Sequence, residues 1–348
     1  MTSRDGVRPA LVELTLARLR EFLREPEAVF WVFIFPILMT CALGIAFRSR
    51  GEPTTLVAIV EGPERSRIEA ALQQSPGVTV KVIASDQADR ALARSDVQLV
   101  IDPGPPLAYR FDPTRAESRL ARRVVDDRLQ RAAGRRDPFV AQEVPVEVVG
   151  SRYIDWLVPG LLGMNIMSTG LWGLGFSIVT ARTRKLLKRL VASPMRRRDY
   201  LLAQLFGRLV FLVFEVAALL GFSHLVFGVP IRGSLLLLAG TCLTGGLSFG
   251  GIGLLVASRA RTVEAVSGLL NLVMLPMWLL SGVFFASSNF PDVMQPFIQA
   301  LPLTALNGAL RAVILEGAGV SAVGQFFAVL AVWGGIGFAA ALALFRWR

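Results

Sequence analysis

The sequence predicts an α-helical polytopic membrane protein with six transmembrane helices and an inserted small α/β extracytoplasmic domain. Two observations predict this fold class. Of the 348 residues, 53% are hydrophobic and 18% are charged, a balance typical of membrane proteins and too apolar for an ordinary soluble domain. Six stretches are long and apolar enough to cross a bilayer, which takes about 20 residues, and a long segment of nearly balanced charge follows the first of them.

The transmembrane helices are predicted in order along the chain. Segment 1–27 comes first and is expected to be a cytoplasmic amphipathic helix. The predicted transmembrane helices are 28–47, 154–180, 202–229, 233–257, 262–286 and 321–345, the last five of which belong to the segment 153–348. The loop 287–320 mixes prolines with apolar residues at helical spacing, which indicates short extracytoplasmic helices at the outer membrane surface.

The segment 48–152 predicts the α/β domain. Its runs "TTLVAIV", "VTVKVI" and "VQLVIDP" are typical of strands, and "LAYRFD" could form a fourth. Helical patterns lie between and after these runs. The longest pattern, "PTRAESRLARRVVDDRLQRAAG", has a proline near its start and a glycine at its end, as a long helix should.

Basic residues in the short loops predict the orientation. They gather at 182–198 and 259–261, whereas the loops of the opposite side contain Arg232 and Arg311 alone. Because short loops rich in Arg and Lys stay on the cytoplasmic side, both termini are expected in the cytoplasm and 48–152 outside it. The predicted location is the cytoplasmic (inner) membrane, crossed several times.

Rare residue types argue against several kinds of site. A single histidine, His224, argues against a His-based zinc site and a Ser-His-Asp triad. The two cysteines, Cys41 and Cys242, lie in apolar runs and indicate neither a disulfide framework nor a metal site. No GxxxxGK[ST] phosphate loop occurs, so we expect no ATP site of that type and no enzyme. Many of the arginines behind the net charge of +11 lie beside apolar runs, which indicates membrane topology and lipid contact rather than nucleic-acid binding.

The stretch 181–204, "ARTRKLLKRLVASPMRRRDYLLAQ", holds eight basic residues and a single acid, Asp199. On a helical projection its leucines share one side and its cations the other, so this helix could lie in the membrane interface until Pro194 ends it. One interpretation is an anchor that only sets topology. The other is a docking element for a cytosolic partner, which would explain the amphipathic helix and the proline break.

The same stretch resembles the coupling region of type-2 ATP-binding-cassette (ABC) exporter permeases. That family usually shows an Arg, a Leu-Leu run, Ser/Thr-Pro and then a basic residue, although here Thr183 stands where Glu is common and Lys185 where Gly is common. The resemblance implies a coupling helix at 182–199 that contacts a cytosolic ATPase. The implied coupling residues are Arg184, Lys185, Leu187, Lys188, Arg189, Leu190, Ser193, Pro194 and Arg197.

Two further segments are similar to the same family. They are "YIDWLVPGLLGMNIM" at the start of the second span and "LPMWLLSGVFFASSNFPDVMQPFIQALPLTALNGALRAVI" at the end of the fifth. The residues that carry this likeness, with an implied motif or gating role, are Asp155, Pro159, Gly160, Pro276, Ser281, Gly282, Pro302, Leu303, Thr304 and Arg311. Six spans with a large domain between the first two are similar to one branch of the family.

The resemblance implies a permease subunit of an ABC exporter. Its partners would be two copies of a cytosolic ABC ATPase, which holds the ATP and Mg, and a second permease chain that is either identical or a paralogue. The chain itself would bind no cofactor. Two other functions stay open: a secondary transporter driven by an ion gradient, and a membrane-anchored receptor that uses the 48–152 domain.

Polar residues inside the predicted spans are candidates for a substrate path: Glu215, Asn165 and Asn271. An ionised carboxylate in mid-span costs at least about 2.5 kcal/mol, so Glu215 is expected to face the protein interior. It contacts either a substrate or a neighbouring helix, and we favour the second interpretation. The two asparagines are more typical of hydrogen bonds between helices.

Overall fold

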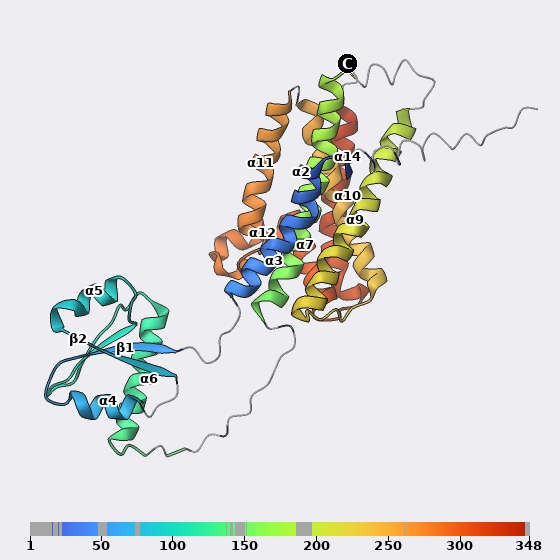
Figure 1. The fold of residues 1–348 in the computed structure, drawn as a ribbon. Helices are drawn as coiled ribbons and strands as arrows, with labels where there is room; N and C mark the ends of the chain where they lie inside the picture. The colour runs from blue at the N-terminus through green and yellow to red at the C-terminus, as the bar shows by residue number, and fades with distance from the viewer. Residues whose placement is uncertain are drawn as a thin grey trace, which may run out of the picture. The chain divides into compact units, whose positions relative to one another are not determined.

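The structure is a computed structural model and divides into two compact units, Ser49–Val146 and a helical unit formed by Met1–Arg48 with Glu147–Arg348 (Figure 1). It describes residues 16, 20, 23–47, 54–73, 77–136, 138, 139, 142, 150, 152–185, 197–260 and 262–344, with the backbone alone for 197–206.

The smaller unit is built on a four-stranded sheet. Its strands are β1 (Thr55–Val60), β2 (Val78–Ile83), β3 (Leu99–Asp102) and β4 (Ala108–Arg110), in the order β2-β1-β3-β4. β1 pairs in parallel with both β2 and β3, while β4 runs antiparallel to β3. All four strands fall within the runs that the sequence predicted as strands.

Helices cover both faces of this sheet. α4 (Arg65–Gln73) and α6 (Ala116–Ala132) pack on one face through a core that includes Ile59 and Ile101. On the other face, α5 (Ala88–Ala93), which follows the short turn η2 (Ser85–Gln87), packs against alternate residues of β1 and β3. This alternation is the period of two that a strand buried on both faces requires.

The helical unit contains, among the described residues, six helices long and apolar enough to cross a membrane. The first span is Pro26–Ala46, made of α2 (Pro26–Val29), the π-helical turn η1 (Phe30–Ile34) and α3 (Phe35–Ala46). The others are α7 (Tyr153–Thr183), α9 (Arg197–Phe227), α10 (Leu235–Arg259), α11 (Val263–Leu280) and α14 (Val320–Leu344). α7 is the central helix, with 72% of its apolar window buried.

Several helix ends differ from the predicted ranges. α11 ends at Leu280 rather than 286, because Ser281 and Gly282 turn the chain and Gly282 adopts a left-handed φ of +70° that favours glycine. α7 continues to Thr183 and α9 begins at Arg197, so both helices extend into the predicted coupling stretch 182–199. α2 begins at Pro26, and most of the predicted amphipathic helix 1–27 lies outside the described residues.

Four short elements fill the connection between α11 and α14. They are η3 (Ser287–Asn289), η4 (Asp292–Met294), α12 (Gln295–Ala300) and α13 (Pro302–Ile314). The chain bends by 83° between Asp292–Ala300 and Pro302–Ile314, a pair that would make a seventh, broken span if it crosses the bilayer. Trp333 of α14 donates a hydrogen bond of 2.8 Å from Nε1 to the Ala300 carbonyl at this bend.

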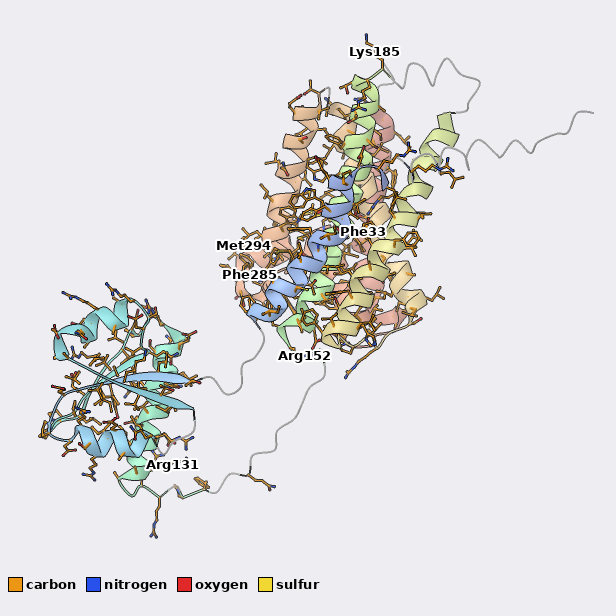
Figure 2. All side chains as sticks on the ribbon, in the orientation of Figure 1. Phe33, Arg131, Arg152, Lys185, Phe285 and Met294 are labelled. Atoms are coloured by element: carbon orange, nitrogen blue, oxygen red, sulfur yellow. The ribbon has the colours of Figure 1, made fainter. Side chains whose placement is uncertain are left out.

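Figure 2 places Arg152 and Lys185 at opposite ends of the helical unit. Arg152 is the N-cap residue of α7, and Lys185 follows its last turn. We refer to these two ends of the unit as the Arg152 end and the Lys185 end.

We predict that the hydroxyl of Tyr109 in β4 loses its proton only at an unusually high pH. Burial, the nearby charge of Asp126 and a hydrogen bond from the Tyr109 hydroxyl to that carboxylate raise the tyrosine pKa from 10 to about 12. The pKa of Tyr109 is higher in the folded chain than in the unfolded chain. The protonated hydroxyl therefore contributes to the free energy of unfolding fully below pH 10, and this contribution is lost as the pH rises towards 12. Difference absorbance titration of the chain against Tyr109→Phe should therefore show phenolate forming only well above pH 10.

In the same titration Asp126→Asn should lower the midpoint without restoring an ordinary value, since burial, the largest cause, remains. A midpoint at the free-tyrosine value in the unchanged chain would contradict the prediction.

Candidate functional site

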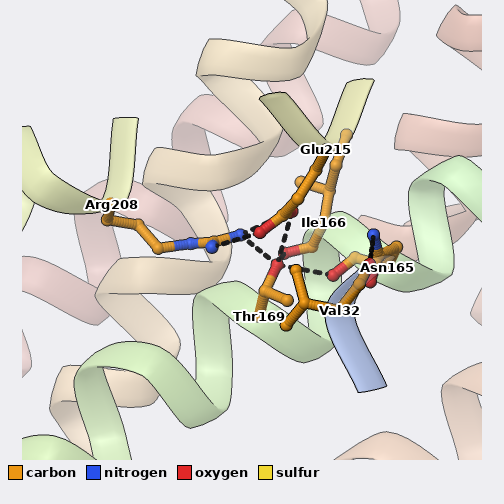
Figure 3. A network of polar contacts seen from close by, with 6 residues as sticks. All are labelled: Val32, Asn165, Ile166, Thr169, Arg208 and Glu215. Atoms are coloured by element: carbon orange, nitrogen blue, oxygen red, sulfur yellow. Dashed lines mark hydrogen bonds and ion pairs between the residues drawn. The ribbon is translucent and has the colours of Figure 1, made fainter. Parts of the chain in front are cut away.

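A buried ion pair joins two positions of α9 to the middle of α7 (Figure 3). Arg208 contacts both carboxylate oxygens of Glu215, at 2.7 Å from Nη1 to Oε1 and 3.1 Å from Nη2 to Oε2. Its Nη2 also donates to the Thr169 hydroxyl of α7. That hydroxyl donates to the Asn165 carbonyl at 2.6 Å and lies 3.2 Å from Glu215 Oε2. We call Arg208, Glu215, Thr169 and Asn165 the Arg208 network.

Helix geometry brings the two charges together. A spacing of seven residues falls about 20° short of two full turns, so Arg208 and Glu215 lie on the same face of α9. The Glu215 side chain has no exposed surface and that of Arg208 is 12% exposed. An isolated charge at such depth is costly, so each group compensates the other.

Asn165 extends this network to the first span. In an α-helix the Val32 carbonyl would accept a hydrogen bond from residue 36, but Pro36 has no N–H to donate. The Asn165 side chain supplies the missing donor, at 3.2 Å from Nδ2 to the Val32 oxygen (Figure 3). Val32 lies within the π-helical turn η1, so the amide holds the first span at its irregular turn.

The structure gathers two of the three residues predicted for a substrate path. Glu215 and Asn165 belong to one network, whereas Asn271 lies on the exposed face of α11 beside Leu272 and Leu275. Sequence reasoning did not single out Arg208 or Thr169. The seven-residue spacing between an arginine and a glutamate inside one apolar span is the signal that could have found Arg208.

A second polar cluster lies towards the Arg152 end, where α11 stops. Arg311 of α13 donates to the Gly282 carbonyl and, from Nε, to the Trp156 carbonyl at 3.4 Å. Its guanidinium carbon also lies 3.9 Å from the centroid of the Trp156 ring, a cation–π contact. Asn307, one turn earlier, donates from Nδ2 to the Ser281 carbonyl at 2.9 Å. We call Arg311, Asn307, Trp156, Ser281 and Gly282 the Arg311 cluster.

Two glycines of α7 allow this close packing. A Cβ on Gly160 would lie 2.8 Å from the Val283 oxygen and 3.2 Å from Arg311 Nη2. A Cβ on Gly163 would overlap the side-chain oxygen of Asn307. A larger residue would therefore require the backbone at Val283 to shift in the case of Gly160, and the Asn307 side chain to move in the case of Gly163. The family likeness pointed to Gly160 but not to Gly163 or Asn307.

The remaining residues of the family likeness are spread around this cluster. Asp155, fully buried in the first turn of α7, pairs with Arg152 through two contacts of 2.7 and 2.9 Å. Pro159 lies inside α7, and Pro276 lies on the exposed side of α11. Pro302, Leu303 and Thr304 form the first turn of α13, where a proline is favoured.

The Lys185 end holds the described part of the predicted coupling region. Arg182 donates from Nη1 to the carbonyls of Ala257 and Ala260 at 3.1 and 2.9 Å, so the end of α7 caps the end of α10. Arg184 and Lys185 are exposed, and Lys185 has a φ of +56°. This left-handed conformation favours glycine, the residue that the family commonly has there.

The other predicted coupling residues cannot be placed in this way. Arg197 is described by its backbone alone. Six others lie outside the described residues: Leu187, Lys188, Arg189, Leu190, Ser193 and Pro194.

Both clusters position helices. Among the described residues, no group of three His, Cys, Asp or Glu side chains lies close enough together to hold a metal ion. The polar groups of the two clusters are instead directed at one another and at main-chain carbonyls of neighbouring helices. Six apolar helices around these buried contacts define a polytopic α-helical membrane protein with a small α/β unit inserted after its first span.

The family follows from comparison with known proteins. Residues 120–315, more than half of the chain, match the family described as "ABC-2 type transporter". The chain therefore belongs to the ABC-2 type transporter family. The matched region begins within α6 and runs to the end of α13. It contains every residue of the Arg208 network and of the Arg311 cluster, whereas the first span lies outside it.

Curated relatives agree with this assignment. The chain is 29% identical over 174 residues to "Inner membrane transport permease YhhJ" of Escherichia coli, which covers 49% of this chain and 46% of that protein. It is 26% identical to "Probable multidrug ABC transporter permease YbhS" of Escherichia coli, over 69% of this chain and 64% of that protein. It is 28% identical to "Nodulation protein J" of Bradyrhizobium diazoefficiens, over 58% of this chain and 76% of that protein. The chain thus spans about half the length of the first relatives it matches.

We predict that Gly163→Ala destabilises the helical unit. The new methyl group would overlap Asn307 Oδ1, and Asn307 would have to release the buried Ser281 carbonyl. We expect a loss of about 2–4 kcal/mol, from overpacking together with an unsatisfied carbonyl. Thermal unfolding in detergent measures it.

Gly240→Ala is the matched control, because a Cβ there meets nothing within 4 Å. Adding Asn307→Ala to Gly163→Ala should recover part of the loss by removing the overlap. Equal unfolding temperatures for Gly163→Ala and Gly240→Ala would show the close approach to be unimportant.

We also predict that removing one charge of the ion pair destabilises the helical unit more than removing both charges. Glu215→Gln leaves the Arg208 charge buried without its carboxylate and should cost about 3–5 kcal/mol of unfolding free energy. The double variant Arg208→Met/Glu215→Met removes both charges and should unfold close to the parent temperature. A double variant that is less stable than Glu215→Gln would refute this prediction.

Proposed function

We propose that this chain is the membrane-spanning permease subunit of an ABC exporter in the cytoplasmic (inner) membrane. It moves its substrate out of the cytoplasm, or out of the inner leaflet, using ATP hydrolysed by a separate cytosolic ATPase. The observation that carries this proposal is the strongly basic connection between α7 and α9, in a chain of the ABC-2 type transporter family that has no phosphate-loop motif of its own.

Charge supports the orientation of this permease. Arg182, Arg184 and Lys185 lie at the Lys185 end, and Arg259 ends α10 beside them. The connection 186–196 adds three more cations. By the positive-inside rule the Lys185 end faces the cytoplasm, and the unit Ser49–Val146 is extracytoplasmic. Both chain termini are then cytoplasmic.

The contacts of Arg182 suggest how movement of the ATPase is transmitted to the transmembrane helices. Because Arg182 binds the last carbonyls of α10, a load on the connection after α7 reaches α7 and α10 together. The proposed docking surface for the ATPase comprises Arg184, Lys185, Leu187, Lys188, Arg189, Leu190, Ser193, Pro194 and Arg197. Two ATPase subunits, which hold the ATP and Mg, and a second permease chain complete the exporter.

Co-purification distinguishes this function from its alternatives. A cytosolic ABC ATPase should co-purify with this chain in stoichiometric amount, and ATP should drive transport in vesicles. A secondary transporter would move cargo with an ion gradient and no ATPase, and a receptor would move none. Transport by the purified chain alone would refute the proposal.

We predict that Leu187→Asp/Leu190→Asp/Pro194→Asp uncouples the exporter. The substitutions would remove two leucines and the proline of the proposed docking segment, while the sequence of the transmembrane helices stays unchanged. We expect normal membrane insertion but a loss of ATPase binding of about tenfold or more, from truncating anchor residues of an interface. Pull-down of the ATPase measures it.

Leu120→Asp is the control, because Leu120 is an exposed leucine of α6 in the other unit. It should leave ATPase binding unchanged. Retention of both ATPase binding and transport by the triple variant would refute the docking role.

A further inference from the structure

The first span and α9 each bury a smaller share of their apolar window than the central helix α7 does. Only 17% of the apolar window of the first span and 33% of that of α9 are buried, against 72% for α7. Side-chain hydrogen bonds add specific contacts to the apolar packing between these two helices and α7. The Arg208 network supplies such bonds to both.

One continuous set of contacts runs across the three helices. Arg208 and Glu215 of α9 meet the Thr169 hydroxyl, Thr169 donates to the Asn165 carbonyl, and the Asn165 amide donates to Val32 (Figure 3). Thr169 and Asn165 are four residues apart on one face of α7. α7 thus holds α9 and the π-helical turn of the first span at neighbouring positions.

The network joins the two helices that lie on either side of the proposed docking segment. α7 ends at Thr183 and α9 begins at Arg197, on either side of the connection that we propose as the docking segment. Thr169 lies near the middle of α7, so the contact is far from that connection. A displacement of α9 can reach the first span through these side chains without a direct contact with the ATPase.

Stability alone does not account for an ion pair here. A buried pair contributes no more than well-packed apolar side chains of the same volume, and often less. Arg208 and Glu215 belong to the same helix, so their mutual attraction attaches α9 to nothing. Within the described part of the chain, the polar contacts that make the pair a connection between helices are those to Thr169.

The acceptor on the first span lies at an irregular turn. Pro36 removes the ordinary α-helical donor for the Val32 carbonyl, and the backbone around Val32 is already a π-helical turn. Such turns are local irregularities at which a helix can bend, because their hydrogen bonds differ from those on either side. The Asn165 amide therefore contacts the first span at the point where it deforms most easily.

We propose that Arg208, Glu215, Thr169 and Asn165 are positioning residues that transmit displacement of α9 to the π-helical turn of the first span. The proposal rests on the proposed exporter function, since it is the ATPase that would displace α9. It assigns the network to movement within one chain, with no role in binding substrate.

Labelling of the first span tests this proposal. Ile34, which is partly exposed in the π-helical turn, is replaced by cysteine in a Cys41→Ala/Cys242→Ala background, and the chain is purified with its ATPase. The rate of reaction with a maleimide is compared before and after trapping with ATP and vanadate. We expect the rate to change by about tenfold in the parent complex, within the range that coupling energies produce.

Thr169→Val should abolish this change, because it removes the hydroxyl that connects α9 to α7. Thr169→Ser keeps the hydroxyl and should restore it. Thr241→Val is the matched control: Thr241 is a buried threonine of α10 whose hydroxyl donates to Leu237 of its own helix at 2.8 Å. It should leave the change intact.

A second variant guards against a loss of folding. Asn165→Leu removes the contact with Val32 but keeps the ion pair and Thr169, and it should also abolish the labelling change while ATP hydrolysis by the complex persists. An unaltered labelling change in Thr169→Val or Asn165→Leu would overturn the inference, as would a parent complex that hydrolyses ATP without any change at residue 34. Failure of the ATPase to bind the parent chain would instead refute the exporter function.

Discussion

Main-chain carbonyls without a helical partner are the central constraint on this helical unit. A bilayer has no water to satisfy such groups, so another helix must provide the donor. The freed carbonyls and their donors are Val32 with Asn165, Ser281 with Asn307, Gly282 with Arg311, Ala257 and Ala260 with Arg182, and Ala300 with Trp333. In each case the donor comes from a different helix. The same bonds that satisfy the backbone therefore also fix how the helices sit against one another.

The overall fold could be predicted because it depends on periodicity and length. Apolar runs located all six spans, and the alternation of strand and helix patterns located β1 to β4 with α4 to α6 between and after them. The end of α11 was predicted six residues too late, since "SGVFFA" is as apolar as the helix before it. What ends the helix is the left-handed glycine and the donors from α13, which are tertiary features.

The site was predictable only in part for the same reason. Glu215 stood out as an acid in an apolar run, but Arg208 resembled one more cation at the cytoplasmic end of a span. Their pairing depends on side-chain direction, and their contact with Thr169 depends on how α7 packs against α9. Gly163 and Asn307 are common residue types in such helices, and only the close approach of α13 to α7 gives them a role. Family likeness found Gly160 and Arg311 because it compares motifs rather than contacts.

Two partly buried arginines, Arg311 and Arg208, show that the local backbone decides which partner a charge requires. Arg311 has no carboxylate within salt-bridge distance in the described part of the chain, yet it lies where α11 ends and unpaired carbonyls carry negative partial charge. The Trp156 ring adds the negative face of its π-system. Arg208 projects from the middle of one helix towards the middle of another, where no helix end is available, and so it requires Glu215. A charge held by a helix end is fixed by the backbone, whereas a charge held by a side chain can move with it. Arg311 is therefore held by main-chain atoms at the end of α11, whereas Arg208 is held by side chains between α7 and α9.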